Sequence, residues 1–348
     1  MPVGDYQLIQ AWQKVLELSQ LKPGQAVTIL TSAATHPQNL SAATVAAQSL
    51  GAVVSRLDLP PLNADKALSR DPFAYLGETP LTGNRPALAA LKSSDLVIDL
   101  MTLLFSPEQH EILAGGTKIL LAVEPPEVLV RTVPTLADRA RVRAACERLG
   151  RAKTMTVTSR AGTEINFALG EFPVVGEYGF VDEPGRWDHW PSGFLFTFAN
   201  EGGSNGRIVI DRGDIVLPQK NYVAEPITLT VEKGFVTRIE GGIDAELLRE
   251  YMASFKDPEA YAISHIGWGL QPRTYWSTLS LYDREQTIAM DARAFEGNFL
   301  FSLGPNNEAG GARTTACHID IPLRACTVSL DGEAVVRDGQ VLDGENAR

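Results

Sequence analysis

The chain has 348 residues, and at roughly 150 residues per domain this length predicts two domains. With 44% hydrophobic and 21% charged residues, its composition is that of a globular protein and excludes a disordered or fibrous chain. The formal net charge of −11 argues against a nucleic-acid or anionic-membrane partner, because phosphate binding requires a basic face.

The first part of the chain alternates between helical and extended patterns. After Asp5, the expected N-cap, apolar residues recur at helical spacing until Pro23-Gly24. Further along, the patterns predict strands at 26–30, 52–59, 96–101 and 118–123 and helices at 39–50 and 107–113. Strands separated by helices are typical of right-handed crossovers. We therefore expect an α/β N-terminal domain with a mostly parallel sheet over residues 1–155.

The pattern changes after a helix predicted at 135–149, which Gly150 is expected to stop. A second helix is expected at 244–255, with Asp244 as its cap. Apolar and polar residues alternate with period two at 154–159, 207–210, 215–217, 226–231 and 235–240. Residues 156–348 are therefore predicted to form an α+β domain that is rich in antiparallel strands and carries the catalytic site.

His318-Ile319-Asp320 is the most informative local motif. Residues two apart in a strand point to the same face, so this imidazole and carboxylate are expected to converge. They would then serve as two ligands of one divalent metal. From spacing alone, a surface hydrogen bond between the two side chains is the competing interpretation.

His265 is the natural third ligand. It lies in an apolar segment, Ile263 to Gly269, whose glycines allow close approach and whose Trp268 would shield the site. A hydrogen-bonded core histidine is the alternative. Two histidines and one carboxylate with open positions are typical of non-haem Fe(II) oxygenases, but a catalytic zinc accepts the same set.

Residues 171–193 combine carboxylates, a histidine and aromatic residues with several glycines and prolines, and are predicted to form a loop. Four aromatic residues between Tyr178 and Trp190 favour a pocket wall over a solvated turn. His36 and His110 lie beside helix-start signals and are expected at the surface.

Other classes of protein find no support in the sequence. No GxGxxG or Walker A motif suggests a nucleotide. The longest apolar run, residues 96–105, is too short to span a membrane and contains Asp99. Three cysteines without a short pairing pattern indicate a reduced compartment, so we expect a cytoplasmic location.

Long runs of this chain resemble the 2,5-dihydroxypyridine 5,6-dioxygenases of nicotinate degradation, which are related in fold to metallopeptidases of the aminopeptidase T type. The resemblance is densest in LAVEPPEVL (121–129), DEPGRWDHWPSGFLFT (182–197), ISHIGWGLQPR (263–273) and MDARAF (290–295). It implies Fe(II) as cofactor and an N-heteroaromatic substrate that is cleaved with O2 to N-formylmaleamate. It also implies a homo-oligomer, with a hexamer as one form.

The resemblance implies roles for individual residues. It makes His265, His318 and Asp320 the iron ligands and places Glu177 and His189 in the substrate pocket. We expect Trp190 and an apolar edge at Leu104 to contact substrate as well, with the active site at the domain interface.

Phe105 is one departure from the family, which carries at this position a histidine thought to act in acid-base chemistry. Phenylalanine cannot move a proton. Glu177, His189 or bound water is then expected to do so, unless the natural substrate differs.

Two other functions remain open at this point. A metallo-aminopeptidase needs several bridging carboxylates near its histidines, and Glu177 is the only obvious extra one. A protein that binds small aromatic molecules without turning them over is the third possibility, with Phe105 as the cause of lost turnover.

Overall fold

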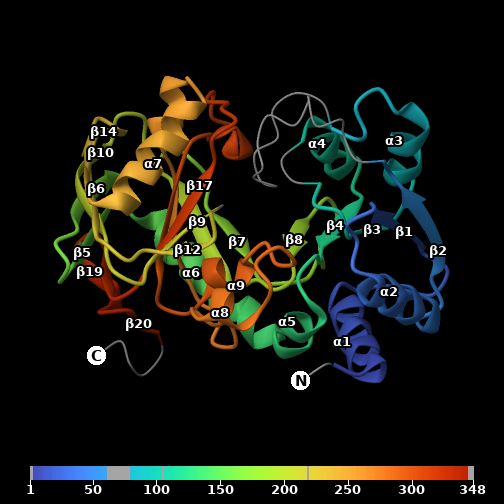
Figure 1. Ribbon diagram of the computed structural model, residues 1–348. Coiled ribbons are helices and arrows are strands. Elements are labelled where there is room, and N and C mark those ends of the chain that lie inside the picture. The colour runs from blue at the N-terminus through green and yellow to red at the C-terminus, as the bar shows by residue number, and fades with distance from the viewer. Residues whose placement is uncertain (1–2, 61–78, 104–105, 218, 344–348) are drawn as a thin grey trace. The chain divides into compact units, whose positions relative to one another are not determined.

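The computed structural model describes residues 3–60, 79–103, 106–217 and 219–343 (Figure 1). Two compact units account for their contacts, and neither is continuous in sequence. Unit 1 contains Met1–Arg139, Glu177–Ser192 and Ser280–Asp291, and unit 2 contains Ala140–Gly176, Gly193–Leu279 and Ala292–Arg348. The boundary predicted between residues 155 and 156 stays a prediction, since units of contact are not independently folding domains. Leu104 and Phe105 lie outside the described residues.

Unit 1 is built on a parallel sheet of five strands. Their order is β2 (Val53–Asp58), β1 (Ala26–Thr31), β3 (Leu96–Asp99), β4 (Lys118–Leu121) and β8 (Trp187–His189). Every neighbouring pair is parallel, which confirms the predicted α/β fold. Within its described residues, this unit contains the helices α1 (Asp5–Leu18), α2 (Pro37–Ser49), α3 (Arg85–Lys92), α4 (Pro107–Ala114) and α5 (Pro126–Arg131).

Local sequence explains where the helices of unit 1 begin. Proline occupies the first turn of α2, α3, α4 and α5, where its missing N–H costs no hydrogen bond. The Ser106 hydroxyl caps α4 by accepting the amide of Gln109. The predicted cap at Asp5 is wrong, because Gly4 occupies the N-cap and no side chain bonds there.

Unit 2 contains two larger sheets. The eight-stranded sheet has the order β14 (Phe235–Gly241), β13 (Ile227–Glu232), β10 (Ser204–Ile210), β6 (Glu164–Ala168), β5 (Thr154–Ser159), β18 (Cys326–Leu330), β19 (Glu333–Arg337) and β20 (Gln340–Val341). The five-stranded sheet has the order β17 (Ile319–Leu323), β16 (Phe299–Leu303), β15 (Ile263–Gly269), β9 (Phe194–Phe198) and β7 (Val175–Glu177). Their strands pair antiparallel, as predicted for this part of the chain.

Smaller elements complete the fold. They are the two-stranded sheet of β11 (Ile215–Val216) and β12 (Asn221–Tyr222) and the helices α6 (Leu136–Arg151), α7 (Ile243–Ser254), α8 (Thr278–Leu281) and α9 (Met290–Ala294). Two predicted helix ends are wrong. Gly150 lies inside α6 and lacks the left-handed backbone of a helix stop. Asp244 does not cap α7, because its carboxylate accepts the amides of Ala224 and Glu225 while Gly242 is the N-cap.

Four strands of the five-stranded sheet, β9, β15, β16 and β17, are buried along their whole length. Their sequences are accordingly apolar, as in FLFTF and FLFSL. A buried polar side chain costs free energy unless it has a partner. Ser264, His265, Ser302 and Asp320 therefore stand out within these strands.

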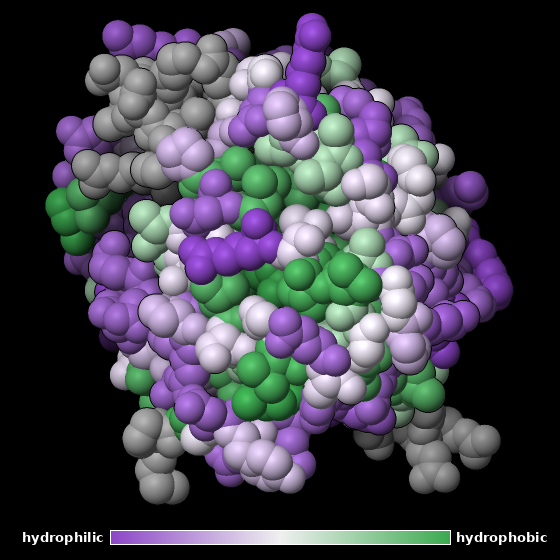
Figure 2. Space-filling view, turned by 90° about the vertical axis from the view of Figure 1, so that its right-hand side faces the viewer, coloured by the Kyte–Doolittle hydropathy of each residue, from purple (hydrophilic) through white to green (hydrophobic). Residues whose placement is uncertain are grey.

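No helix in the described ranges is long and apolar enough to cross a membrane. On the face shown in Figure 2, hydrophobic residues (green) are interrupted by hydrophilic ones (purple).

Candidate metal centre and acid-base pair

Three buried side chains of unit 2 converge on one point. His265 lies on β15, Asp320 on β17, and His318 directly precedes β17. Asp320 Oδ1 lies 3.0 Å from His265 Nε2 and 3.3 Å from His318 Nε2, and the two imidazole nitrogens are 3.4 Å apart. The structure thus brings together the three residues singled out in the sequence. The competing interpretation of a surface pair is wrong, since all three are buried.

Strand pairing explains this convergence. Asp320 lies opposite Ser302 of β16, and the Ser302 hydroxyl accepts the amide N–H of His265 on the next strand at 2.9 Å. The ring of His265 packs against Phe196 of β9, with 4.9 Å between ring centroids. Hydrogen bonding and packing therefore hold the imidazole in place.

The donor set fits a divalent metal ion. Ligand bonds of about 2.1 Å that meet near right angles place donor atoms about 3 Å apart, close to the observed separations. Asp320 Oδ1 is buried without a hydrogen-bond donor, as expected for an atom that would bind a cation. Among the described residues, no fourth His, Cys, Asp or Glu belongs to this group.

Arg293 of α9 binds the other oxygen of Asp320. Its Nε–H donates to Oδ2 at 2.5 Å. Burial acts to raise the pKa of Asp320, but His318, Arg293 and His265 hold this pKa well below its usual range. The carboxylate is therefore ionised, as a metal ligand must be. Sequence reasoning missed both Arg293 and Ser302, because neither belongs to a spacing motif.

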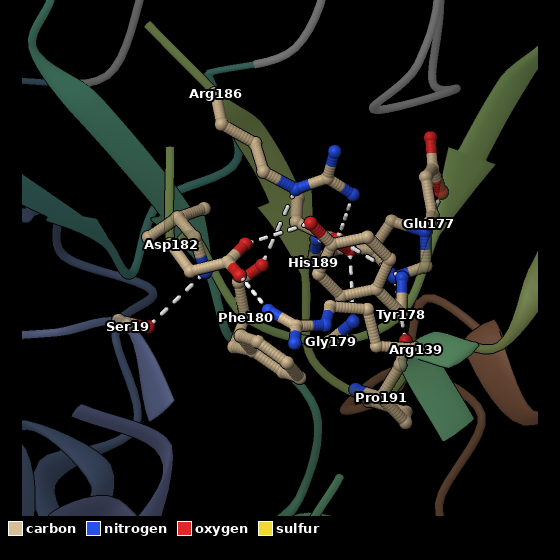
Figure 3. Close-up of polar contacts among 12 residues, drawn as sticks. Ser19, Arg139, Glu177, Tyr178, Gly179, Phe180, Asp182, Arg186, His189 and Pro191 are labelled. Carbon is tan, nitrogen blue, oxygen red and sulfur yellow. Dashed lines mark hydrogen bonds and ion pairs between the residues drawn. The ribbon is translucent and has the colours of Figure 1, made fainter. Parts of the chain in front are cut away.

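A second buried pair lies in unit 1, where Glu177 ends β7 and His189 ends β8 (Figure 3). Glu177 Oε2 forms an ion pair with His189 Nε2, and His189 Nδ1 lies 2.5 Å from the Pro191 carbonyl. A carbonyl only accepts, so Nδ1 carries a hydrogen and Nε2 faces the carboxylate. The predicted loop at 171–193 is wrong at β7 and β8, whose three residues each are too few for a periodic pattern.

The two pKa values of this pair are shifted in the same direction. Burial raises the pKa of Glu177, against the opposing pull of His189. Burial would lower the pKa of His189, but the Glu177 carboxylate raises it, with smaller contributions from Asp188 and the Pro191 carbonyl. At neutral pH the pair therefore holds one proton between Oε2 and Nε2.

The remaining predicted residues have different surroundings. Trp190 is buried in unit 1, where its indole packs edge-on against Trp12 and its Nε1–H donates to the Thr132 carbonyl. Its contact with substrate stays a prediction. His110 is exposed, and His36 is half-buried at the N-cap of α2.

Comparisons with known proteins show the family to which this chain belongs. A family model described as 2,5-dihydroxypyridine 5,6-dioxygenase matches residues 7–343. The 2,5-dihydroxypyridine 5,6-dioxygenase of Pseudomonas putida KT2440 is 55% identical over 348 residues, which are 100% of this chain and 99% of that protein. The solved structure of 2,5-dihydroxypyridine dioxygenase from the same strain has a TM-score of 0.96 at 54% identity, with both chains covered completely.

A more distant structure shares the fold. Wild-type AmpT from Thermus thermophilus has a TM-score of 0.61 at 15% identity, covering 97% of this chain and 99% of that one. At this identity the likeness shows the fold alone.

Proposed function

Because this chain belongs to the 2,5-dihydroxypyridine 5,6-dioxygenase family, we propose that it cleaves 2,5-dihydroxypyridine between ring carbons 5 and 6. The second substrate is O2, and the product is N-formylmaleamate. The observation that carries this proposal is the buried group of two imidazoles and one carboxylate, in a chain 55% identical to an enzyme of that name.

In this proposal His265, His318 and Asp320 hold Fe(II). Two histidines and one carboxylate that leave coordination positions open are the donor set of non-haem Fe(II) oxygenases. When bound, the ferrous ion supplies the redox chemistry between an electron-rich ring and O2. The protein contributes fixed ligand directions, through Ser302 at His265 and Arg293 at Asp320.

Glu177 and His189 are proposed to manage the proton of the reaction. The pair holds one proton at neutral pH, and a second would leave both side chains protonated. It can therefore accept the proton of a ring hydroxyl and return it later. Leu104, Phe105 and Trp190 are proposed to contact the ring, and Phe105 itself has no group that moves a proton.

The metallo-aminopeptidase alternative has less support. A two-metal peptidase needs bridging carboxylates, and within the described ranges Asp320 is the only carboxylate of the metal group. AmpT shares the fold of this chain, which says nothing of activity. The homo-oligomer, with a hexamer as one form, stays a prediction.

Loading the metal-free protein with Fe(II) under anaerobic conditions tests the proposal. We expect one iron per chain and O2 uptake when 2,5-dihydroxypyridine is added. His318→Ala and Asp320→Ala should lose both iron and uptake, whereas His110→Ala, at an exposed histidine, should keep both.

Three outcomes would contradict the proposal, and each would point to a different conclusion. A His318 or Asp320 variant with full iron occupancy would refute the ligand set. Two zinc or cobalt ions per chain, together with peptide hydrolysis, would support the peptidase. Quenching of tryptophan fluorescence by the substrate without O2 uptake would indicate a binding protein.

A further inference from the structure

Asp188 is a completely buried carboxylate in unit 1 that the function proposed above does not use. Its two oxygens accept four hydrogen bonds. Three come from the backbone amides of Tyr178 at 2.9 Å, Gly179 at 3.1 Å and His189 at 2.8 Å. The fourth comes from the guanidinium of Arg186 at 2.7 Å. An ionised carboxylate with this many donors is strongly held in one orientation.

Two of these bonds connect the two strands that carry the Glu177–His189 pair. The amides of Tyr178 and Gly179 directly follow Glu177 in the chain, and the third amide is that of His189 itself. One carboxylate therefore fixes the backbone on both sides of the ion pair. Figure 3 shows Glu177, Tyr178, Gly179 and His189 close to one another.

Arg186 is the counter-charge of Asp188. Its guanidinium lies over the Tyr178 ring, 3.8 Å from the ring centroid. Tyr178 Oη donates to Asp182 at 2.7 Å, and Asp182 pairs in turn with Arg139 (Figure 3). Arg139 thus belongs to the same network, but it pairs with Asp182 and not with Asp188.

Among the residues that the structure describes, few charged groups act directly on the pair. Asp188 influences it from within β8 and Arg186 from the residue just before β8, and the phenol ring of Tyr178 lies beneath the Arg186 guanidinium. On the neighbouring strand β4, the residue paired with His189 is the uncharged Leu121.

We propose that Asp188 and Arg186 form a buried ion pair that positions Glu177 against His189 and controls the proton these two residues share. Asp188 is thus a positioning residue and does not itself react. The importance of this control for turnover rests on the acid-base role proposed above. The control itself is a property of unit 1 that is measurable without turnover.

The two charges act in opposite directions. The negative charge of Asp188 favours the protonated form of the pair, and the positive charge of Arg186 opposes it. Asp188→Asn should therefore lower the pH midpoint of the His189 imidazole. Arg186→Gln should raise this midpoint, because the charge of Asp188 is then uncompensated. Each shift is expected to be about one pH unit, as for other unit charges within a few ångströms.

Titration of the His189 ring nitrogens by ¹⁵N NMR of the full chain, assigned with His189→Gln, measures these midpoints. Arg139→Gln is the matched control, since it removes an arginine of the same network that does not contact Asp188. Its midpoint should equal that of the unchanged protein. If Asp188→Asn does not fold, the other two variants still test the proposal. A raised midpoint in Arg186→Gln beside an unchanged one in Arg139→Gln would support it, and equal midpoints would overturn it.

Opposite shifts for Asp188→Asn and Arg186→Gln would support the proposal, since a merely structural disturbance has no reason to reverse its sign. Shifts in the same direction, or none, would overturn it. The pH dependence of kcat should move with the midpoints while KM changes little. Opposite midpoint shifts without a matching change in the kcat profile would leave the ion pair's control of the proton intact and refute the acid-base role.

Discussion

Arg293 Nε–H donates to Asp320 Oδ2 at 2.5 Å, and the two side chains are only 5% and 4% exposed. This bond occupies one carboxylate oxygen, so Oδ1 alone faces the imidazoles of His265 and His318. Asp320 can then contribute a single donor atom to a metal ion. With two histidines and one oxygen as ligands, positions remain open for substrate and O2.

Replacing Arg293 should weaken metal binding. Residues that hydrogen-bond a metal ligand typically contribute about 10- to 100-fold in affinity, and we expect a loss of this order for Arg293→Gln. Arg293→Lys should recover part of it, because the positive charge remains. Titration with Co(II), followed by its visible absorption, gives the dissociation constant without turnover.

Arg141→Gln is the control for Arg293, since Arg141 pairs with Glu296 and Asp343 in the same unit and does not contact the metal group. Its Co(II) affinity should be unchanged. Equal affinities for Arg293→Gln and the unchanged protein would show that Arg293 does not support the ligand.

Removing the metal should destabilise the protein. An ion that binds only the folded state stabilises it by about 2.7 kcal/mol when its free concentration is 100 times the dissociation constant. Chelator treatment should therefore lower the melting temperature, and added Fe(II) should restore it under anaerobic conditions. Asp320→Asn should melt at the same temperature with and without Fe(II), and a full metal-dependent gain in that variant would contradict the site.

Two glycines of unit 2 should respond to alanine in opposite ways. A Cβ on Gly267, in β15, would lie 1.9 Å from the Leu195 carbonyl oxygen on the neighbouring strand. Gly267→Ala should therefore lower the free energy of unfolding by more than about 3 kcal/mol and displace His265. Gly150 lies in α6, where a Cβ meets only Val174 at 3.7 Å.

Gly150→Ala should raise the free energy of unfolding by about 0.5–1 kcal/mol, because alanine is the better helix former. Urea denaturation of both variants tests the pair of predictions. A stable Gly267→Ala protein with unchanged metal affinity would show that β15 and β9 can separate without cost to the site.

The free energy of unfolding should fall as the pH rises from about 4 to about 6, because of Asp99. Burial raises the pKa of this carboxyl to about 6, against three opposing backbone hydrogen bonds. With an ordinary value near 3.8, the unfolded chain releases this proton first as pH rises, which favours unfolding. The difference of about two pH units corresponds to about 3 kcal/mol lost by pH 7.

Asp99→Asn removes this titration. Its unfolding free energy, measured in urea from pH 4.5 to pH 7, should therefore decline less than that of the unchanged protein. If the unfolding free energies of the variant and the unchanged protein declined equally, the Asp99 carboxyl would titrate alike in the folded and unfolded chain.

The spacing of apolar residues predicted those helices and strands that a single segment of the sequence determines. The strands β1, β3 and β4 and the helices between them follow from apolar periodicity within single segments. β8 was missed because it has three residues, and its place beside β4 is a long-range pairing. Asp5 and Asp244 have the residue type of a helix cap, but in both cases a glycine takes the capping position.

The metal site was likewise predictable where it depends on local spacing, and not where it depends on strand order. The spacing of His318 and Asp320 indicated a shared face because strand geometry is periodic. That His265 joins them depends on the order β17-β16-β15, which single-segment patterns do not contain. Arg293, Ser302 and Asp188 act through hydrogen bonds to residues on other elements or across turns, so no motif marks them.

Isotope labelling is the most direct test of the proposed cleavage of the ring by O2. The Fe(II)-loaded protein should be mixed with 2,5-dihydroxypyridine under ¹⁸O2 in ordinary water, and the ring-opened product analysed by mass spectrometry without delay. A dioxygenase places both labelled atoms in N-formylmaleamate. A product with one labelled atom or none would show that this protein is not a dioxygenase acting on 2,5-dihydroxypyridine.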